Sequence, residues 1–260
     1  AITTGYFLSR PNRFIAQVET AEGIQTVHVK NTGRCRELLI PGALVYLEQS
    51  MNPSRKTQFD LIAVQKGKRL INMDAQAPNK VFAEWVENGG FLEGITAVRS
   101  EYRYGASRLD FCLETPKGRH FVEVKGVTLE EGGFARFPDA PTERGVKHIQ
   151  ELQKAVEAGL DATLFFVVQM EHIKSVAPND DTHLAFGKAL RTAAAAGVHI
   201  LAYDCTVTPN SIAIRNSVPV ILSAKETRGE RFGFIRFGFN WCWTINGCFC
   251  CCHLPGTLYA

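Results

Sequence analysis

The chain has 260 residues, an ordinary hydrophobic fraction of 45% and a formal net charge of +3. At this length one hydrophobic core commonly gives way to two, so we expect two domains. No apolar run is long and charge-free enough to span a bilayer, and the opening residues lack the apolar stretch of a signal peptide. These features exclude a membrane protein and predict a cytoplasmic one.

The charges are unevenly distributed. Residues 1–78 carry ten Lys and Arg against six Asp and Glu, whereas residues 79–222 carry fifteen against eighteen. A basic first segment favours contact with a polyanion, and an acidic second segment favours a metal site. Scattered surface charge is the alternative interpretation.

Residues 1–78 are predicted to form a small β-barrel. Short β-patterns separated by turn-rich pieces occur at Phe14–Glu19, Ile24–Lys30, Leu44–Glu48, Phe59–Gln65 and Arg69–Met73. Five such strands fit an OB-like barrel, which is a common platform for nucleic acids.

The loops of this barrel carry cations and small polar side chains suited to phosphate oxygens. We predict that they bind DNA largely without sequence preference, because the chain has no recognition helix or zinc finger. Solubilising loops on a structural barrel are the alternative. The candidate DNA-binding residues are Arg10, Arg13, Lys30, Asn31, Thr32, Arg34, Arg36, Arg55 and Lys56.

Residues 79–89 are predicted to form a helix, with Asn79 as the N-cap and Gly89-Gly90 as the stop. Glu84 lies off the apolar stripe of this helix. It is either a solvated glutamate or a further carboxylate near the site described next.

Residues 107–125, SRLDFCLETPKGRHFVEVK, are predicted to form a β-hairpin. Alternation along a strand projects Glu123 and Lys125 on one side, and pairing brings Asp110 to nearly the same level. Two carboxylates and a lysine suit phosphodiester hydrolysis, because the carboxylates hold a divalent cation and the lysine orients water or offsets phosphate charge. An ordinary surface Glu/Lys pair is the alternative.

After a predicted loop over 126–141, a helix begins near Thr142 and carries Arg144 and His148 on its polar flank. These side chains would hold a phosphate and transfer a proton, or simply form a salt-bridged exterior. Buried strands at Ala162–Val168 and Val198–Tyr203, a helix at His183–Ala196 and a short strand at Ile212–Arg215 complete the prediction. This order predicts an α/β sandwich with a mixed sheet.

Residues 223–260 differ from the rest of the chain. They contain five of the eight cysteines and two of the three tryptophans. A zinc site is not expected, because adjacent cysteines on one short segment cannot easily surround a tetrahedral ion. We predict an atypical, disordered tail that arises from translation past the normal stop or out of frame.

The chain resembles the sugar fermentation stimulation protein A family over about residues 6–222. The resemblance rests on the blocks SRPNRF, VKNTGRCREL, NPSRKT, YGASRLDF, FVEVKGVTL, FPDAPTERGVKH and GVHILAYD. It implies an OB-like domain over 1–78 and a PD-(D/E)XK nuclease-like domain over 79–222, with DNA binding and a role in maltose use. The nuclease motif falls on Asp110, Glu123 and Lys125, and the family's first-helix glutamate falls on Glu84.

Two classes of function follow. In the first, the protein is a DNA phosphodiesterase in which Asp110 and Glu123, joined by Glu84, hold Mg²⁺ or Mn²⁺. Lys125 then positions water, and Arg144 or His148 steadies the phosphate. In the second, it is a DNA-binding regulator of sugar metabolism genes that keeps the fold without turnover.

Overall fold

A computed structural model describes residues 1–31, 33–52 and 54–223 of the chain. Residues 1–224 form one compact unit. The predictions of a disordered tail over 223–260 and of no zinc there concern residues that, from 224 on, lie outside the described part of the chain.

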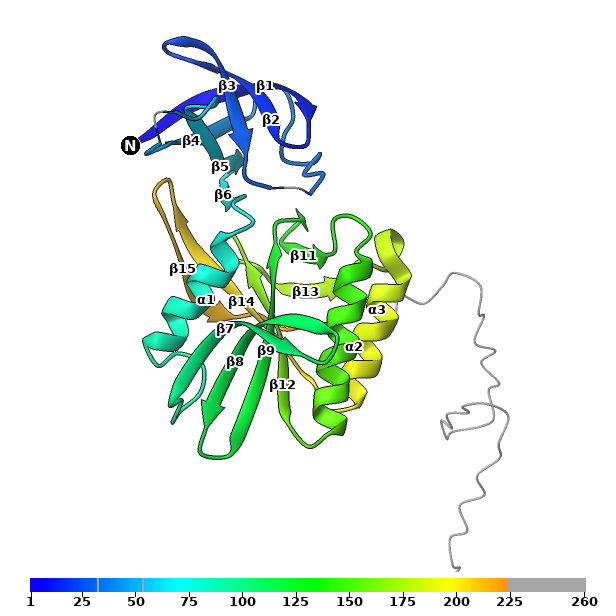
Figure 1. Cartoon of the computed structure of the whole chain (residues 1–260). Coiled ribbons are helices and arrows are strands. Elements are labelled where there is room, and N and C mark those ends of the chain that lie inside the picture. Colours follow the sequence, from blue (N-terminus) through cyan, green and yellow to red (C-terminus); the bar gives the residue numbers. More distant parts are fainter. Residues whose placement is uncertain (32, 53, 224–260) are drawn as a thin grey trace, which may run out of the picture. The chain divides into compact units, whose positions relative to one another are not determined.

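The N-terminal domain is a closed β-barrel (Figure 1). Its sheet has the order β3-β2-β1-β4-β5-β6, and β3 also pairs with β5, which closes a five-stranded ring. The strands are β1 (Ile2–Asn12), β2 (Ile15–Thr20), β3 (Gly23–Val29), β4 (Leu44–Gln49), β5 (Phe59–Lys66) and β6 (Arg69–Asn72). The barrel therefore has the predicted OB architecture.

The membership of that ring differs from the strand prediction. Strand β1 was missed, although it pairs with both β2 and β4. Register shifts between Phe7 and Ser9 and between Ser9 and Asn12 interrupt its alternation, so its sequence shows no clean period of two. Strand β6 lies outside the ring and, among the described strands, pairs with β5 alone.

The second domain is built on a six-stranded sheet of order β15-β14-β12-β9-β8-β7. Strands β9, β12 and β14 run parallel and the outer pairs run antiparallel, so the sheet is mixed, as predicted. Its strands are β7 (Ala97–Tyr104), β8 (Ser107–Thr115), β9 (Gly118–Val127), β12 (Asp161–Val168), β14 (His199–Thr208) and β15 (Ser211–Ser217).

Three helices cover the two faces of this sheet (Figure 1). Helix α1 (Ala77–Glu87) packs Phe82 and Val86 against the face that carries Val122 and Val124. Helices α2 (Glu143–Glu157) and α3 (Asp180–Ala195) cover the opposite face, where they pack with Phe121. His183 interrupts α3 with non-helical backbone angles, where a helix start was predicted. None of the helices in the described part of the chain has the length and apolarity needed to cross a bilayer.

Half of the segment predicted as a loop over 126–141 lies in strands. Strand β9 continues to Val127, and β10 (Glu130–Glu131) and β11 (Phe134–Phe137) follow. A small sheet forms when β11 pairs with β10 and with β13 (Ser175–Pro178). Glycines between short apolar pieces suggested a loop, but pairing with the distant β13 is a tertiary interaction that local sequence does not reveal.

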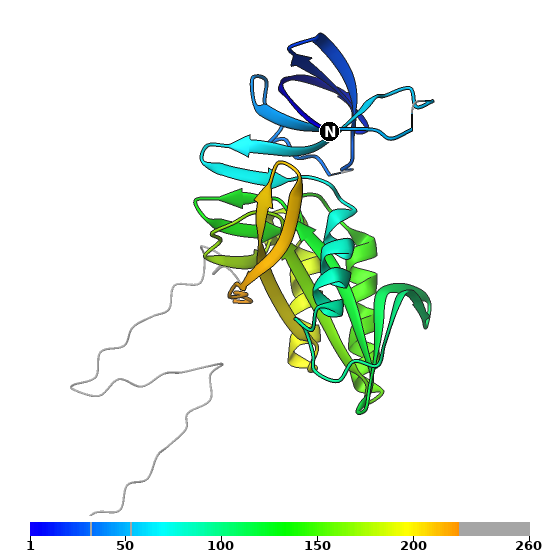
Figure 2. The ribbon, with the colours of Figure 1, turned by 90° about the vertical axis from the view of Figure 1, so that its left-hand side faces the viewer.

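A buried polar network joins the barrel to the second domain. Glu130 Oε1 lies 2.7 Å from Arg69 Nη1 and accepts from the Gly133 N–H at 2.5 Å, while Oε2 lies 3.1 Å from Lys66 Nζ. The Asn72 N–H donates to the Gln169 carbonyl at 2.9 Å. Figure 2 shows the hairpin of β14 and β15, in orange, beside this junction. Every charge of the Glu130 cluster is therefore paired.

Candidate active site

Glu123 is the most deeply buried member of the predicted site. Its side chain is 1% exposed, and Oε1 is in contact with both Lys125 Nζ and His148 Nδ1. Burial acts to raise the pKa of Glu123, but the His148 hydrogen bond and the Lys125 charge outweigh burial and lower this pKa. Oε2 has no hydrogen-bond partner among the described residues. Oε1 therefore has two partners, whereas Oε2 has none among the described residues; we call Oε2 the open oxygen.

Asp110 lies beside Glu123, where strands β8 and β9 stop pairing regularly. The ladder reaches Phe111 and Val122, and one position further the Asp110 carboxylate accepts from the Val124 N–H at 2.8 Å. Burial raises the pKa of Asp110, and the nearby charge of Glu123 raises it further. The negative charge of each carboxylate disfavours the ionisation of the other. A cation bound beside both would remove this repulsion, so the site favours a cation.

The backbone is irregular at this level of the sheet. Strand β7 pairs Ser100 with Phe111 and Tyr102 with Leu109, which leaves Glu101 opposite Asp110 without a regular pair. Glu101 has a φ of 51°, in the left-handed region that is uncommon for a residue with a side chain. Such outliers cluster at functional sites.

Asn79 is a site residue that sequence reasoning missed. It was expected to cap α1, but the N-cap is Gln76, and Asn79 Nδ2 donates instead to Asp110 Oδ1 at 2.9 Å. The approach depends on Gly126, because a Cβ there would lie 2.6 Å from Pro78 Cγ. Pro78 was the available signal, since proline favours the first helical turn and so places the cap before Asn79.

Arg144 and His148 reach the site from α2, which Thr142 caps by accepting from the Gly145 N–H. His148 is 5% exposed, not part of a polar exterior, and its Nε2 accepts from Arg144 Nε at 3.4 Å. Since Nε2 is the acceptor, the proton of a neutral His148 lies on Nδ1 and points to Glu123. The structure therefore links Arg144, His148 and Glu123 in one chain.

Glu84 is not brought to the other two carboxylates. It is exposed on α1, which covers the sheet face opposite Glu123. Within the described residues no group of three or more His, Cys, Asp or Glu side chains is arranged to hold a metal. The donor set at hand is two carboxylates, which suffices for Mg²⁺ because this ion commonly keeps several waters and uses one or two carboxylates. The open Glu123 Oε2 fits such an ion.

The predicted DNA-binding residues of the barrel fall into two groups. Arg10 donates to four backbone carbonyls, Lys30 lies 2.6 Å from Asp74, and Arg55 forms a two-pronged pair with Asp60. Asn31 also bonds within the chain, to Met73 and Gly33. The exposed cations are Arg13, Arg34, Arg36 and Lys56. Thr32 lies outside the described residues.

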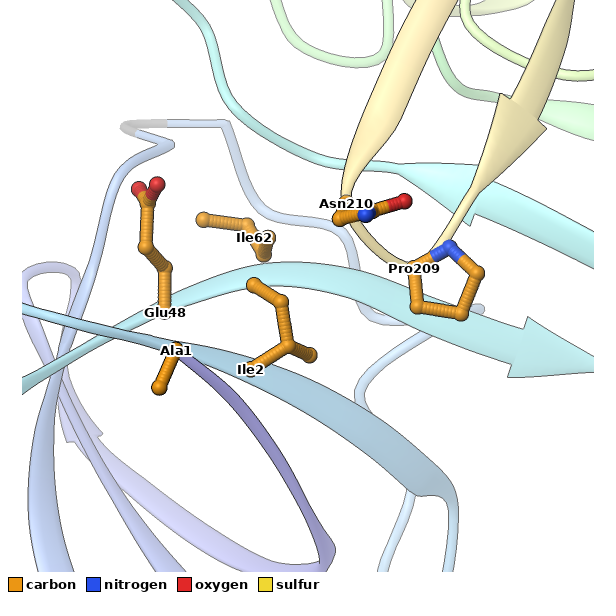
Figure 3. A pocket seen from close by; sticks show the side chains of 6 residues that line it. All are labelled: Ala1, Ile2, Glu48, Ile62, Pro209 and Asn210. Atoms are coloured by element: carbon orange, nitrogen blue, oxygen red, sulfur yellow. The ribbon is translucent and has the colours of Figure 1, made fainter.

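Two hollows flank the domains. The larger, of 590 Å³, is lined by Ala1, Ile2, Glu48, Ile62, Pro209 and Asn210 and contains none of the predicted site residues (Figure 3). The smaller, of 340 Å³, has a lining that includes Pro78, Gly126 and Thr142 but neither Asp110 nor Glu123. It also includes Asn31 and Gly33 of the barrel.

Comparison with known proteins identifies the chain. Residues 8–73 match the SfsA N-terminal OB domain, and residues 76–211 match the sugar fermentation stimulation protein RE domain. The chain belongs to the sugar fermentation stimulation protein family. Homologues from Ruminiclostridium cellulolyticum and Desulfitobacterium hafniense strain Y51 are 54% and 57% identical over 221 residues. These alignments cover 85% of this chain and 98% and 96% of the relatives.

A solved structure of the sugar fermentation stimulation protein family is also similar. The structure of Pyrococcus furiosus SfsA in complex with Ca²⁺ aligns with a TM-score of 0.78 at 31% identity, over 85% of this chain and 96% of that one. The predicted family and fold are therefore confirmed. The roles of individual residues, and the domain limits at 78 and 222, stay predictions.

Proposed function

We propose that this protein is a DNA-binding, divalent-metal-dependent phosphodiesterase whose active site is centred on Asp110 and Glu123. The observation that carries the proposal is the open Oε2 of a glutamate that is otherwise fully enclosed. Leaving a buried carboxylate oxygen unsatisfied costs about 1–3 kcal/mol or more, and a bound ion is one way in which such an oxygen is satisfied.

The residues divide the chemistry between them. His148 and Lys125 hold Glu123 Oε1, which fixes the carboxylate plane and turns Oε2 toward the ligand. Asp110 is held by both of its oxygens, because Asn79 donates to Oδ1 and the Val124 N–H donates to Oδ2. A bound Mg²⁺ or Mn²⁺ supplies charge neutralisation at the phosphate and a more acidic water. Lys125 orients the attacking water, and Arg144, exposed at the rim, stabilises phosphate charge.

DNA is the proposed polyanion because four of the cations predicted to bind phosphates are exposed on the barrel loops. Arg13, Arg34, Arg36 and Lys56 give sequence-independent contacts to phosphates, so affinity falls as salt rises. The Ca²⁺ complex of the related P. furiosus protein supports a divalent ion.

The test is incubation of the full chain with supercoiled plasmid in Mg²⁺, Mn²⁺ or chelator, beside an Asp110→Asn variant. We expect nicking that requires the metal and is lost in the variant. Intact plasmid under every metal condition, with DNA binding retained, would instead support the second candidate, a DNA-binding regulator. That candidate is favoured by the Lys125–Glu123 ion pair, which already neutralises one carboxylate.

A further inference from the structure

Phe14 is an exposed aromatic ring on a hydrogen-bonded turn of the barrel. Its side chain is 44% exposed, at the turn between β1 and β2. The Arg13 guanidinium carbon lies 4.9 Å from the ring centroid. An aromatic ring beside a cation, in solvent, has the composition of a stacking platform for nucleic-acid bases.

The backbone around Phe14 is fixed from several directions. Its N–H donates to Asn12 Oδ1 at 2.9 Å, and its carbonyl accepts from the Val29 N–H at 2.8 Å. The ring is therefore carried on a rigid turn, and no loop ordering is needed before a ligand can stack on it.

Arg10 joins this turn to the neighbouring loop. Its guanidinium donates to the carbonyls of Arg13 and Asn31, both at 2.7 Å, and to those of Gly33 and Arg34 at 3.0 and 2.8 Å. Both terminal nitrogens of the Arg10 guanidinium donate to backbone carbonyls, and these bonds hold the backbone of Arg13 and Arg34 together. The side chains of Arg13, Arg34 and Arg36 are exposed and form no ion pair with other described residues.

From this arrangement we infer that the barrel binds an unpaired DNA strand, with a base stacked on Phe14 and the flanking phosphates on Arg13, Arg34 and Arg36. Duplex DNA presents phosphates to the same arginines, but its bases are stacked on each other and offer Phe14 no free face. The inference rests on the proposed function for DNA binding. It adds that the barrel selects single-stranded DNA.

The experiment measures fluorescence anisotropy of the full chain with labelled dT20 and with a labelled 20-base-pair duplex, in chelator so that neither is cleaved. Phe14→Ala should weaken dT20 binding about tenfold, which is the loss of one stacked base, and change duplex affinity less than about twofold. Phe14→Trp should restore dT20 binding.

Phe134 provides a matched control on the second domain. It is 48% exposed, with Lys174 Nζ 5.2 Å from its ring centroid, so Phe134→Ala removes an equivalent exposed ring beside a cation. This variant should bind dT20 like the wild type. A strand of the same length without bases should bind the wild type no better than dT20 binds Phe14→Ala.

The outcomes separate the two proposals. Equal losses for dT20 and duplex in Phe14→Ala, or no loss for either, would overturn the stacking role while leaving DNA binding in place. Failure of the wild type to bind either DNA at low salt would overturn the proposed function itself.

Discussion

Glu123 and Glu130 are both buried, at 1% and 4% exposure, and both meet a lysine, yet their surroundings differ. At Glu130 each oxygen has a partner, supplied by Arg69, Lys66 and the Gly133 N–H. At Glu123 one oxygen takes two partners and the other takes none among the described residues. The fold therefore satisfies both oxygens of Glu130, and in the proposed function a bound ion would satisfy the second oxygen of Glu123.

The pKa of Glu123 and the pKa of Glu130 are both lowered, so the contrast in pKa is between Glu130 and Asp110. Burial acts to raise the pKa of Glu130, but the Gly133 N–H and the Lys66 and Arg69 charges lower it. Next to Glu123, by contrast, the pKa of Asp110 is raised by burial and by like charge. Ionised carboxylates thus help hold the two domains together at Glu130 and oppose folding at Asp110.

The largest expected effect concerns activity. Glu123→Gln keeps the shape of the side chain but removes the charge at the open oxygen, so metal-dependent nicking should fall at least about 100-fold. Glu130→Gln and Glu84→Gln, assayed on the same plasmid at a temperature where all three are folded, should stay within about threefold of the wild type. Loss of nicking in Glu84→Gln would show that Glu84 joins the site in the loaded protein.

The next effect concerns stability at Glu130. Glu130→Gln leaves Lys66 and Arg69 facing a neutral group and should lower the free energy of unfolding. The loss should be about 2 kcal/mol, below the usual cost of breaking a fully buried pair, because Lys66 and Arg69 are 34% and 24% exposed. Denaturant melts of the wild type and of Glu130→Gln test this difference in the free energy of unfolding.

The same cluster should lose its contribution in acid. A carboxyl whose pKa is lowered on folding stabilises the protein above its unfolded pKa, near 4.5, and this stability disappears as pH falls through the lowered value. The difference between wild type and Glu130→Gln should therefore shrink below about pH 4.5. A difference that stays constant to pH 3 would contradict the assigned charge interaction.

Asp110→Asn should stabilise the metal-free protein at pH 7, by roughly 1 kcal/mol, because functional sites commonly cost stability. The amide can still accept from Val124, and Asn79 can turn to present its own carbonyl. Since the pKa of Asp110 is raised, the gain should vanish as pH falls through that value toward 3.8. Added Mg²⁺ should raise the melting temperature of the wild type but not of the variant.

The smallest effects concern the barrel cations. Here an exposed arginine, Arg36, can be compared with Arg55, which is paired with Asp60. Arg36→Ala should weaken duplex binding a few-fold and reduce the salt slope by about one ion. Arg55→Ala breaks the pair with Asp60 and should lower stability more than it lowers DNA affinity. Binding isotherms at several salt concentrations, beside thermal melts, distinguish the two. Equal salt slopes for the wild type and Arg36→Ala would remove Arg36 from the interface.

The sequence predicted the hairpin well because its information is local. The Pro116-Lys117-Gly118 turn and the alternation around Glu123 set the register that brings Asp110 opposite it. The burial of His148 was left open, since helical spacing alone does not show which side of a helix faces a carboxylate. Asn79 and the partners of Arg10 were missed because both depend on tertiary contacts between distant segments.

The hydrogen bond from the Val124 amide to Asp110 makes one backbone proton a reporter of the site. Most amides in β9 are protected from exchange with solvent by neighbouring strands, and their protection reports unfolding of the sheet. The protection of Val124 depends instead on the position of a side chain that a ligand would engage. Its amide exchange rate and chemical shift should therefore change when a cation binds or Asp110 is protonated, while the amides of Phe121 and Val122 stay constant.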